Sequence, residues 1–240
     1  MITHIAHKTS TGRSYEGIPI HAAEGVHDEV ASALMSILPE NEHVLELAAG
    51  SGALTRRLLN LGYKITPSDI NSDTWSIPTI ELKPIDLNES SWPENYADQS
   101  FGAVLAVEVI EHLENPSQFM RNIYRVLKPG GIAIVTTPNV LCTETLIQYI
   151  KYGCLFGYSE EQFFRTGHIS TIPPWLLKIL AEQASFCDTN IKLIGKLDKS
   201  GAKLYLTRLI AKALQFTRAG NVYQCNGDGV TSMLIAKKEN

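Results

Sequence analysis

Hydrophobic and polar positions follow two patterns along the chain, one with the spacing of helices and one typical of buried strands. Apolar residues at helical spacing predict helices over residues 26–38, 54–61, 116–127 and 173–185. Short apolar runs predict strands over residues 43–47, 64–70, 80–85, 101–107, 132–136, 186–197 and 230–237. Because strands and helices alternate along the chain, we expect an α/β fold with a doubly wound, mostly parallel sheet.

We expect a single domain over residues 1–240, with added segments at its edges. Residues 1–25 are interpreted as an N-terminal arm, because they begin without a clear period. Residues 140–171 are predicted to be a lid insertion, with a helix over 140–152 and an aromatic loop over 153–167. These segments read as additions to one core and not as independent domains.

A further added segment, residues 198–227, is predicted to be an amphipathic helical insertion built on a helix over 203–218. One face of that helix is apolar, and the other carries basic residues such as Arg208 and Lys212. Such a helix packs on a protein as a lid or dimer contact, or it makes a peripheral contact with an anionic membrane. We favour packing, and both a monomer and a homodimer stay open.

Composition narrows the class of protein. The formal net charge of −4 argues against a general nucleic-acid binder, because such domains carry a basic excess. The four cysteines lack Cys-x-x-Cys spacing, so we expect neither a structural metal nor a disulfide framework. The N-terminus has no apolar signal-peptide core, and no apolar run approaches the roughly 18 residues that cross a bilayer. We therefore expect a cytoplasmic protein with reduced thiols.

A glycine-rich turn follows the first predicted strand and precedes a helix. Its pattern is Glu46-x-Ala48-x-Gly50-x-Gly52, and such a turn lets a ligand approach the backbone closely. Thr55 stands where a dinucleotide fingerprint needs its third glycine, and no lysine follows as in a P-loop. A carboxylate at position 46 would repel a pyrophosphate, but it suits a ligand that carries an ammonium and a sulfonium. A purely structural turn is the alternative.

Two more acids follow the next predicted strands. Asp69 lies at the distance from the glycines at which an acid binds ribose hydroxyls in doubly wound folds. Asp86 can accept a hydrogen bond from an adenine amino group, and the Leu87 amide can reach a ring nitrogen. Each acid alone is also compatible with a simple turn. Together with Glu46, at one edge of the sheet, they predict a phosphate-free nucleoside with a cationic tail.

Several ordered motifs resemble those of class I S-adenosylmethionine-dependent methyltransferases. They are the glycine turn, Asp69, Asp86-Leu87, the strand with its Glu-Val-Ile-Glu-His-Leu continuation at 101–113, and Arg-Val-Leu-Lys-Pro-Gly-Gly at 125–131. The Glu-Val-Ile-Glu-His-Leu and Thr-Pro-Asn elements are similar to the branch that includes ubiquinone-pathway O-methyltransferases. The resemblance covers about residues 44–139. It implies a Rossmann-like sheet of seven strands, the last antiparallel, with helical lid insertions.

The resemblance also implies which residues bind S-adenosylmethionine and its product S-adenosylhomocysteine. Carried over by position, the cofactor-binding residues are Glu46, Ala48, Gly50, Gly52, Asp69, Ile70, Asp86, Leu87, Val107 and Glu108. The first four would face the methionine part, Asp69 the ribose, and Ile70, Asp86 and Leu87 the adenine. This chain departs from the family at Ala48, where glycine is common, at Pro67 in the second strand, and at Ala103, where aspartate is commoner.

A hydroxyl acceptor must lose its proton during transfer, which a positioned histidine or carboxylate can accept. The candidate catalytic residues are His112, then His168 in the lid and Glu111. Each also has a structural interpretation, as a loop cap, a lid-ordering residue or a backbone partner. Four other histidines cannot be ranked from the sequence, namely His4, His7, His21 and His27. No metal site is predicted.

The aromatic residues of the lid are the last candidate feature. They either form a wall of the acceptor pocket or a small satellite core, and they are Tyr149, Tyr152, Phe156, Tyr158, Phe163 and Phe164. The sequence as a whole predicts an enzyme that methylates a small molecule, most simply on oxygen. The alternatives are a non-catalytic protein that binds the same cofactor, and an NAD(P)-linked oxidoreductase, which Glu46 and Thr55 disfavour.

Overall fold

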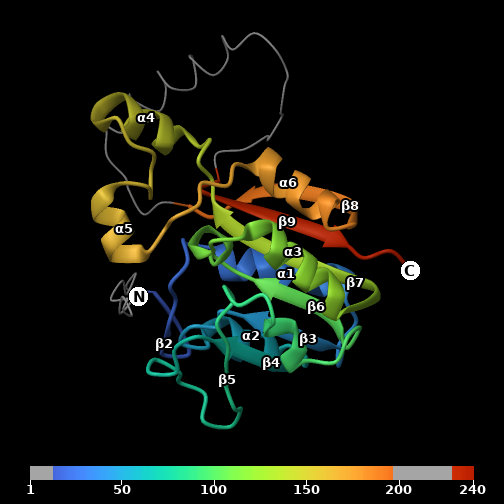
Figure 1. The fold of residues 1–240 in the computed structure, drawn as a ribbon. Coiled ribbons are helices and arrows are strands. Elements are labelled where there is room, and N and C mark those ends of the chain that lie inside the picture. The colour runs from blue at the N-terminus through green and yellow to red at the C-terminus, as the bar shows by residue number, and fades with distance from the viewer. Residues whose placement is uncertain (1–12, 197–228) are drawn as a thin grey trace.

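The computed structural model describes residues 13–196 and 229–240. These residues form a large sheet with helices on both faces and a small separate hairpin (Figure 1). The helices are α1 Val26–Ile37, α2 Ala53–Asn60, η1 Trp92–Asn95, η2 Ile110–His112, α3 Pro116–Val126, α4 Thr143–Tyr152, α5 Glu160–Thr166 and α6 Pro174–Gln183. The strands are β1 Ser14–Tyr15, β2 Ile18–Pro19, β3 His43–Leu47, β4 Lys64–Asp69, β5 Lys83–Pro84, β6 Phe101–Ala106, β7 Leu127–Pro138, β8 Cys187–Ile194 and β9 Thr231–Lys237.

The large sheet has the strand order β5-β4-β3-β6-β7-β9-β8. Neighbouring strands from β5 to β7 are parallel, whereas β9 is antiparallel to both β7 and β8. The order runs outward in both directions from β3 and β6, which makes the sheet doubly wound and creates a switch point between these strands. The predicted α/β fold and its seven-stranded, mostly parallel sheet with an antiparallel last strand are therefore confirmed.

Helices cover both faces of the sheet, which explains the continuous apolar runs of its central strands. Helices α3 and α6 pack on one face, around Leu45, Val104 and Val135. Helices α1 and α2 pack on the other face, around Val44 and Leu105. Successive side chains of β3 and β6 point to opposite faces, and both faces are buried, as expected of a parallel strand.

Some predicted elements differ from the structure. The strand expected over 80–85 is reduced to β5, which forms only a short ladder with β4 at the sheet edge. The loop expected over 153–167 contains α5, whose N-cap Ser159 accepts a hydrogen bond from the Gln162 amide. A serine followed three residues later by glutamine is a sequence signal for the start of a helix. Strand β7 is also longer than the predicted 132–136.

The arm predicted over 1–25 is partly structured. Its β1–β2 hairpin places Ile18 in a small core with Ala53 and Ile77. Residues 1–12 and the insertion predicted over 198–227, with its helix over 203–218, lie outside the described residues. Within the described ranges, none of the helices combines the length and the apolar character needed to cross a membrane.

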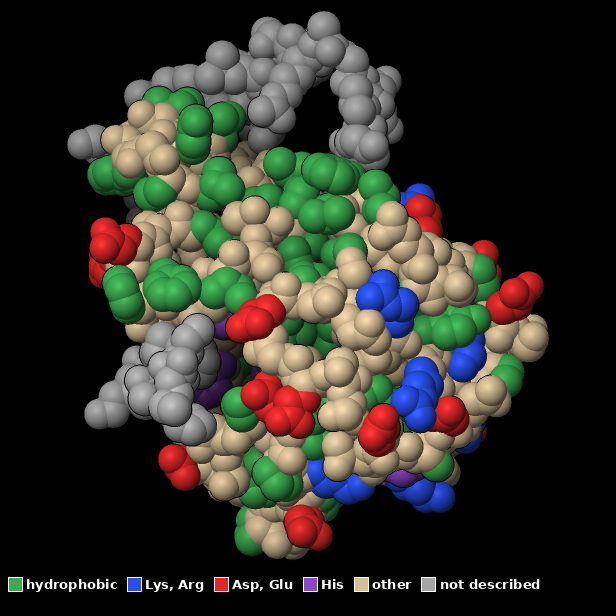
Figure 2. All heavy atoms as spheres, viewed as in Figure 1, with side chains coloured by type: hydrophobic (Ala, Val, Ile, Leu, Met, Phe, Trp, Pro, Cys, Tyr) green, Lys and Arg blue, Asp and Glu red, His purple; other side chains and the backbone are tan. Residues whose placement is uncertain are grey.

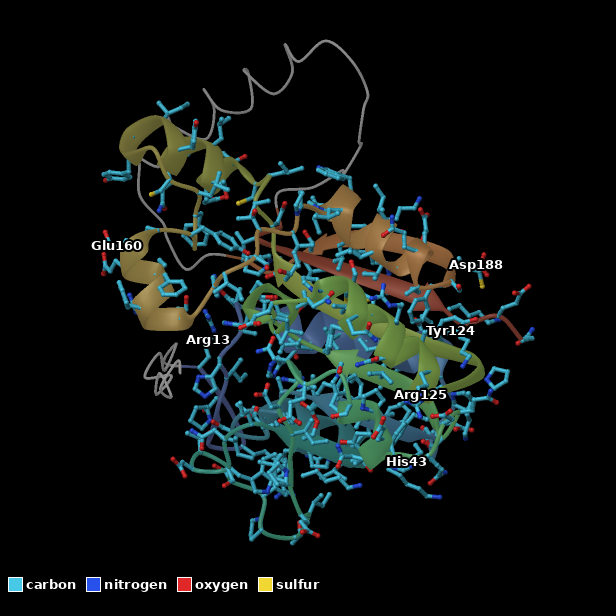
Figure 3. All side chains as sticks on the ribbon, in the orientation of Figure 1. Arg13, His43, Tyr124, Arg125, Glu160 and Asp188 are labelled. Atoms are coloured by element: carbon cyan, nitrogen blue, oxygen red, sulfur yellow. The ribbon has the colours of Figure 1, made fainter. Side chains whose placement is uncertain are left out.

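Different segments surround the two ends of the sheet. In Figure 3, His43 at the start of β3 and Glu160 at the start of α5 lie on opposite sides of the molecule. Helices α4 and α5 follow the carboxyl end of β7, so the lid stands at the end where the parallel strands finish (Figure 1). In an open α/β sheet a ligand binds outside the carboxyl ends of the strands, so a site is expected at that edge.

Candidate active site

The chain turns sharply between β3 and α2, at the carboxyl end of β3. Ala48, Gly50 and Gly52 all have positive φ, of 57°, 56° and 91°. A Cβ atom on Gly52 would lie 2.9 Å from both Trp75 Cζ3 and Ile77 Cδ1, so glycine is required there. The turn is therefore tight, and the amides of Ala49, Gly50 and Gly52 already donate hydrogen bonds within the protein.

Asp69, the last residue of β4, is bonded directly to this turn. Its Oδ2 accepts a hydrogen bond from the Gly50 amide at 2.8 Å, and its Oδ1 accepts one from the Asn71 amide at 2.9 Å. A carboxylate has about four lone-pair sites, so these bonds leave acceptor capacity for ribose hydroxyls. Next to it Ile70 is 56% exposed, as an apolar surface for a nucleoside base requires.

Glu46 lies beneath the turn and not at its surface. Its side chain is buried, and its Oε2 accepts a hydrogen bond from Thr55 Oγ1 at 2.5 Å. The pKa of Glu46 is raised to about 8. Burial is the largest cause, the hydrogen bond from Thr55 opposes it, and the charge of Asp69 adds to it. From the sequence, Thr55 was interpreted only as the residue that replaces the third glycine of a dinucleotide fingerprint. In the structure it donates a hydrogen bond to the Glu46 carboxyl group.

Asp86 and Leu87 follow β5 at the same edge. The Ile85 amide donates to the Asp69 carbonyl at 3.0 Å, which places Asp86 beside the end of β4. Asp86 Oδ1 accepts a hydrogen bond from the Asn88 amide at 2.9 Å, so the turn interpretation of this residue also holds. Leu87 is half-buried against the core.

Val107 and Glu108 follow β6, the other strand at the switch point. The Glu108 amide donates to Thr136 Oγ1 at 2.9 Å, and that hydroxyl donates to Glu108 Oε1 at 2.8 Å. Burial raises the pKa of Glu108 to about 7, despite this hydrogen bond. Val107 is half-buried against the core on the α1–α2 face of the sheet. The roles of these edge residues toward the cofactor stay predictions.

Sequence reasoning could not rank one residue of this edge, His21, and did not name another, Trp75. His21 Nε2 lies 2.9 Å from Ser51 Oγ, so the segment before α1 folds back onto the glycine turn. Trp75 packs on Gly52 and donates its indole N–H to the carbonyl of Ile77 at 2.9 Å. Both contacts join segments that are far apart in sequence, and no local pattern signals them.

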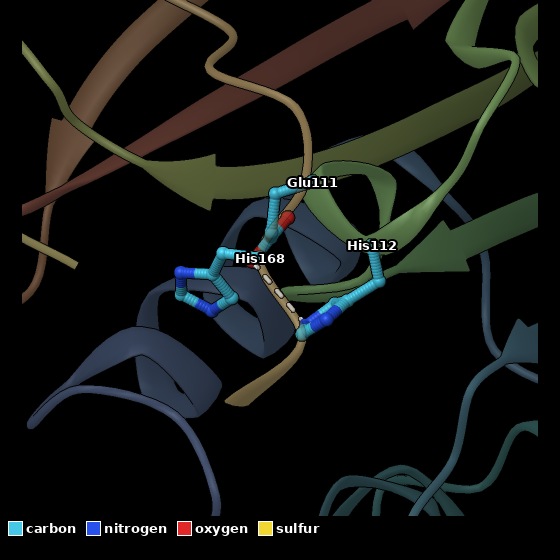
Figure 4. A group of neighbouring side chains, drawn as sticks. All are labelled: Glu111, His112 and His168. Atoms are coloured by element: carbon cyan, nitrogen blue, oxygen red, sulfur yellow. Dashed lines mark ion pairs between the residues drawn. The ribbon is translucent and has the colours of Figure 1, made fainter. Parts of the chain in front are cut away.

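The three candidate catalytic residues converge (Figure 4). Glu111 and His112 lie in η2, and His168 comes from the lid, yet one ligand atom of each lies within 4.8 Å of the others. His112 Nε2 is 3.9 Å from Glu111 Oε1, and the rings of His112 and His168 meet edge to face at 4.8 Å. The lid thus completes a site that η2 begins.

The lid segment is fixed to η2 through its backbone. The Glu111 carbonyl accepts hydrogen bonds from the amides of Ile169 at 3.0 Å and Ser170 at 2.9 Å. His168 Nδ1 lies 2.9 Å from the Gly157 carbonyl, which can only accept. Nδ1 therefore carries a proton, and Nε2 is the basic nitrogen of the neutral ring.

Glu111 has a different character from the two histidines. Its side chain is completely buried, and this burial, with the charge of Glu108, raises its pKa well above the ordinary value. Glu111 therefore holds its proton more strongly than an ordinary carboxyl group does. The group of Glu111, His112 and His168 could also hold a metal ion, so the absence of a metal site stays a prediction.

The lid aromatics do not form one closed wall. Hydrophobic side chains gather on the surface of α4, α5 and α6 (Figure 2). The most exposed lid aromatics are Tyr152 at 75%, Phe164 at 65% and Tyr149 at 58%. Tyr158 instead turns inward, with its ring 5.3 Å from that of His168. Of the predicted wall, Tyr158 is the member that the structure places against the catalytic group.

The comparisons with known proteins agree with this architecture. Residues 45–135, which run from β3 through most of β7, match the family model described as a methyltransferase domain. The chain carries a class I S-adenosylmethionine-dependent methyltransferase domain. S-adenosylmethionine is the cofactor of this domain, and the cradle at the ends of β3 and β4 fits a phosphate-free nucleoside.

Curated relatives of this methyltransferase domain share a printed name. "Ubiquinone biosynthesis O-methyltransferase" of Rickettsia bellii is 33% identical over 48% of this chain and 50% of its own length. The mitochondrial protein of that name from Dictyostelium discoideum is 30% identical over 61% of this chain and 48% of its own length. The chain thus matches about half the length of these relatives.

Solved structures show the same fold at low identity. An S-adenosylmethionine-dependent methyltransferase from Archaeoglobus fulgidus is 18% identical, with a TM-score of 0.60 over 88% of this chain and 94% of that one. Phosphoethanolamine N-methyltransferase 2 from Haemonchus contortus, in complex with S-adenosyl-L-methionine, is 14% identical, with a TM-score of 0.57 over 92% and 54%. These likenesses concern the fold of the methyltransferase domain.

Proposed function

We propose that this chain is an enzyme that transfers a methyl group from S-adenosylmethionine to a hydroxyl group of a small-molecule acceptor. The observation that carries the proposal is the convergence of His112 and His168 after the carboxyl end of β6. The names of the curated relatives support oxygen as the methylated atom.

The cradle residues bind and orient the cofactor in this proposal. Asp69 accepts hydrogen bonds from the ribose hydroxyls while it stays bonded to the Gly50 amide. The glycine turn borders the methionine part, and the buried Glu46 lies beneath the turn with its hydrogen bond from Thr55. When bound, S-adenosylmethionine supplies a methyl group on a sulfonium, whose sulfur leaves as the neutral thioether of S-adenosylhomocysteine. Much of the catalysis is then alignment of the acceptor oxygen with that methyl carbon.

The histidine pair removes the acceptor proton. The O–H bond of the acceptor breaks toward an imidazole nitrogen while the oxygen forms its bond to the methyl carbon. Nε2 of His168 is suited to this step, because Nδ1 donates to the Gly157 carbonyl. His112 lies against it and shares the acceptor side of the site.

Titration calorimetry and a methyl-transfer assay test the proposal in two steps. The full chain should bind S-adenosylmethionine and S-adenosylhomocysteine but not NAD, and preference for NAD would overturn the cofactor assignment. A panel of phenols, dihydroxybenzenes, alcohols and amines is then offered with methyl-labelled S-adenosylmethionine. Transfer to a hydroxyl supports the proposal, whereas transfer to amines alone, or cofactor binding without transfer to any acceptor class, counts against it.

A further inference from the structure

A cavity beside the cofactor edge lies between the β1–β2 hairpin, the start of α1 and α2. Its volume is about 250 Å³, below the roughly 300–1,000 Å³ typical of pockets for drug-sized ligands, so it fits only a small ligand. Its charged and imidazole side chains are those of Arg13, Glu24, His27, Asp28 and Arg57. Among the described residues that line it, none belongs to the glycine turn or to the strand end at Asp69. The cavity is therefore separate from the cofactor cradle.

The guanidinium group of Arg57 is held in place from two sides. Its Nη1 bonds the Asp28 carboxylate, and its central carbon lies 4.3 Å from the centre of the Tyr15 ring. Its Nε is buried and has no hydrogen-bond partner among the described residues. Buried polar atoms in folded proteins are almost always hydrogen-bonded, so this fixed N–H group requires an acceptor.

His27 brings a second buried nitrogen to the same cavity. Its Nδ1 also has no hydrogen-bond partner in the described part of the chain. Burial and, after it, the positive charge of Arg57 lower the pKa of His27 to about 4, while the charge of Asp28 opposes this shift. The imidazole is therefore neutral at pH 7, and in the tautomer with its proton on Nδ1 this atom donates to a ligand oxygen.

The start of α1 and Arg13 add further donors. The N-cap of α1 is Gly25, which has no side chain to cap the first amides of the helix. Because a helix N-terminus carries a partial positive charge, such amides attract anions. Arg13 is fixed to the same segment, since its Nη2 donates to the Ala22 carbonyl at 3.1 Å. Donors from the arm, α1 and α2 thus reach one cavity.

The two acids of the lining lie on its solvent side. Glu24 is exposed, and the Asp28 side chain is 64% exposed while it bonds Arg57. Water and salt weaken the field of exposed charges more than that of buried groups. The inner lining is therefore dominated by nitrogen donors, and it favours an anion.

We propose that this cavity binds a phosphate group, either of inorganic phosphate or of a small phosphate ester. The oxygens of phosphate point in tetrahedral directions, which suits donors from three separate segments better than a planar carboxylate does. Guanidinium groups also bind phosphate through their forked donors. Ile20 lines the cavity, whereas the next residue, His21, contacts Ser51 in the glycine turn. Phosphate should therefore bind beside S-adenosylhomocysteine without displacing it.

Calorimetry on the full chain in Tris buffer, with sodium chloride keeping the ionic strength constant, measures the binding of inorganic phosphate. We expect saturable binding, with and without saturating S-adenosylhomocysteine. Arg57→Lys should weaken it roughly 10–100-fold, because lysine keeps the positive charge but loses the buried Nε–H, a hydrogen bond to a charged group. Glycerol 3-phosphate distinguishes the two sources of the phosphate group: tighter binding than inorganic phosphate identifies an ester as the ligand, and equal or weaker binding identifies inorganic phosphate.

Arg125→Lys is the matched control. Arg125 also pairs with an aspartate, since its Nε lies 2.6 Å from Asp98 Oδ1, but it lies far from Arg13 and the cavity (Figure 3). This substitution should leave the affinity for phosphate unchanged. Equal weakening in the two variants would overturn the proposal, and so would the absence of saturable binding. Competition between phosphate and S-adenosylhomocysteine would place the phosphate in the cofactor cradle and overturn it as well.

A second measurement does not depend on how the variants fold. In NMR spectra of the wild type at constant pH, phosphate should shift the imidazole signals of His27, which lines the cavity. The signals of His43, which bonds Thr66 at the other end of β3, should stay in place. Shifts of similar size for both histidines, or for neither, would show that phosphate does not occupy this cavity.

Discussion

The cofactor edge and the acceptor side of this site are built in opposite ways. At the cofactor edge the polar groups are already bonded to one another, as between Asp69 and the Gly50 amide and between Thr55 and Glu46. On the acceptor side, side chains of η2 and of the lid meet through ring contacts beside a buried carboxyl group, as between His112 and His168 next to Glu111. The cradle is therefore organised by hydrogen bonds at the sheet edge, whereas the acceptor side depends on how the lid packs against η2.

The two regions also differ in how far apart their residues lie in sequence. The cradle comes from strand ends that are adjacent in the sheet, with Leu47 in register with Ser68 and Asp69 with Pro84. The acceptor side needs the lid, which brings His168 to His112 across 56 residues of chain. We therefore expect substitutions in the cradle to weaken binding of the cofactor, and substitutions on the acceptor side to lower turnover.

The largest expected effect is on turnover. His168→Ala and His112→Ala should each lower kcat by roughly 10²–10⁴-fold, the usual contribution of a general base, with cofactor affinity almost unchanged. Steady-state kinetics with the best acceptor of the panel measures this. His43→Gln is the control, because His43 bonds Thr66 at the opposite end of β3. Near-wild-type kcat in both histidine variants would remove them from the mechanism.

The next effect is on cofactor binding. Asp69→Asn should weaken S-adenosylhomocysteine about 100-fold, because it replaces a charged acceptor with a neutral amide, and hydrogen bonds to charged groups contribute roughly 1.5–3 kcal/mol. Calorimetry on the full chain measures the loss. Asp73→Asn, an exposed acid in the loop that follows, should leave affinity unchanged. Equal effects of the two substitutions would argue against a specific role of Asp69.

The same contrast explains what the sequence could predict. The positions of Glu46, Asp69 and Asp86 at strand ends could be predicted, because a strand followed by a turn with an acid is a local pattern. A parallel sheet then brings these strand ends to one edge. The sequence named His112 and His168 as candidates from their positions after a strand and in the lid, but it did not predict their contact. The contact of His21 with Ser51 was not predicted either. Burial of the Glu111 carboxyl depends on packing between segments that are far apart in sequence, so the sequence could not predict it.

A smaller effect concerns pH and stability. The folded-state pKa of Glu46 is about 8, above its ordinary value of 4.5, so the folded chain keeps a proton that the unfolded chain releases in this range. The free energy of unfolding of the cofactor-free protein should therefore fall as pH rises from about 5 to 8, by about 1 kcal/mol per pH unit for one such group.

Urea unfolding at several pH values measures this slope. Glu46→Gln should flatten it in part, because Glu108 and Glu111 contribute shifts of the same sign from the acceptor side. Glu111→Gln should flatten it too, without weakening the cofactor. A slope that Glu46→Gln leaves unchanged would show that the Glu46 carboxyl is not held in its neutral form, since buried His27 contributes with the opposite sign at the acid end of the window.

The smallest effect tests the departure of the glycine turn from the family pattern. Ala48 has a φ of 57°, which costs an L-residue roughly 1–2 kcal/mol. Ala48→Gly removes this strain. It also stabilises the unfolded chain by about 0.4–1 kcal/mol, because glycine gives that chain more conformational freedom. In addition, the substitution removes a half-buried methyl group. The free energy of unfolding should thus rise by about 0.5 kcal/mol. Ala31→Gly, inside α1, should instead lower it by about 1 kcal/mol or more. If both substitutions destabilise alike, the alanine is not strained, and the turn is as well adapted to alanine as to glycine.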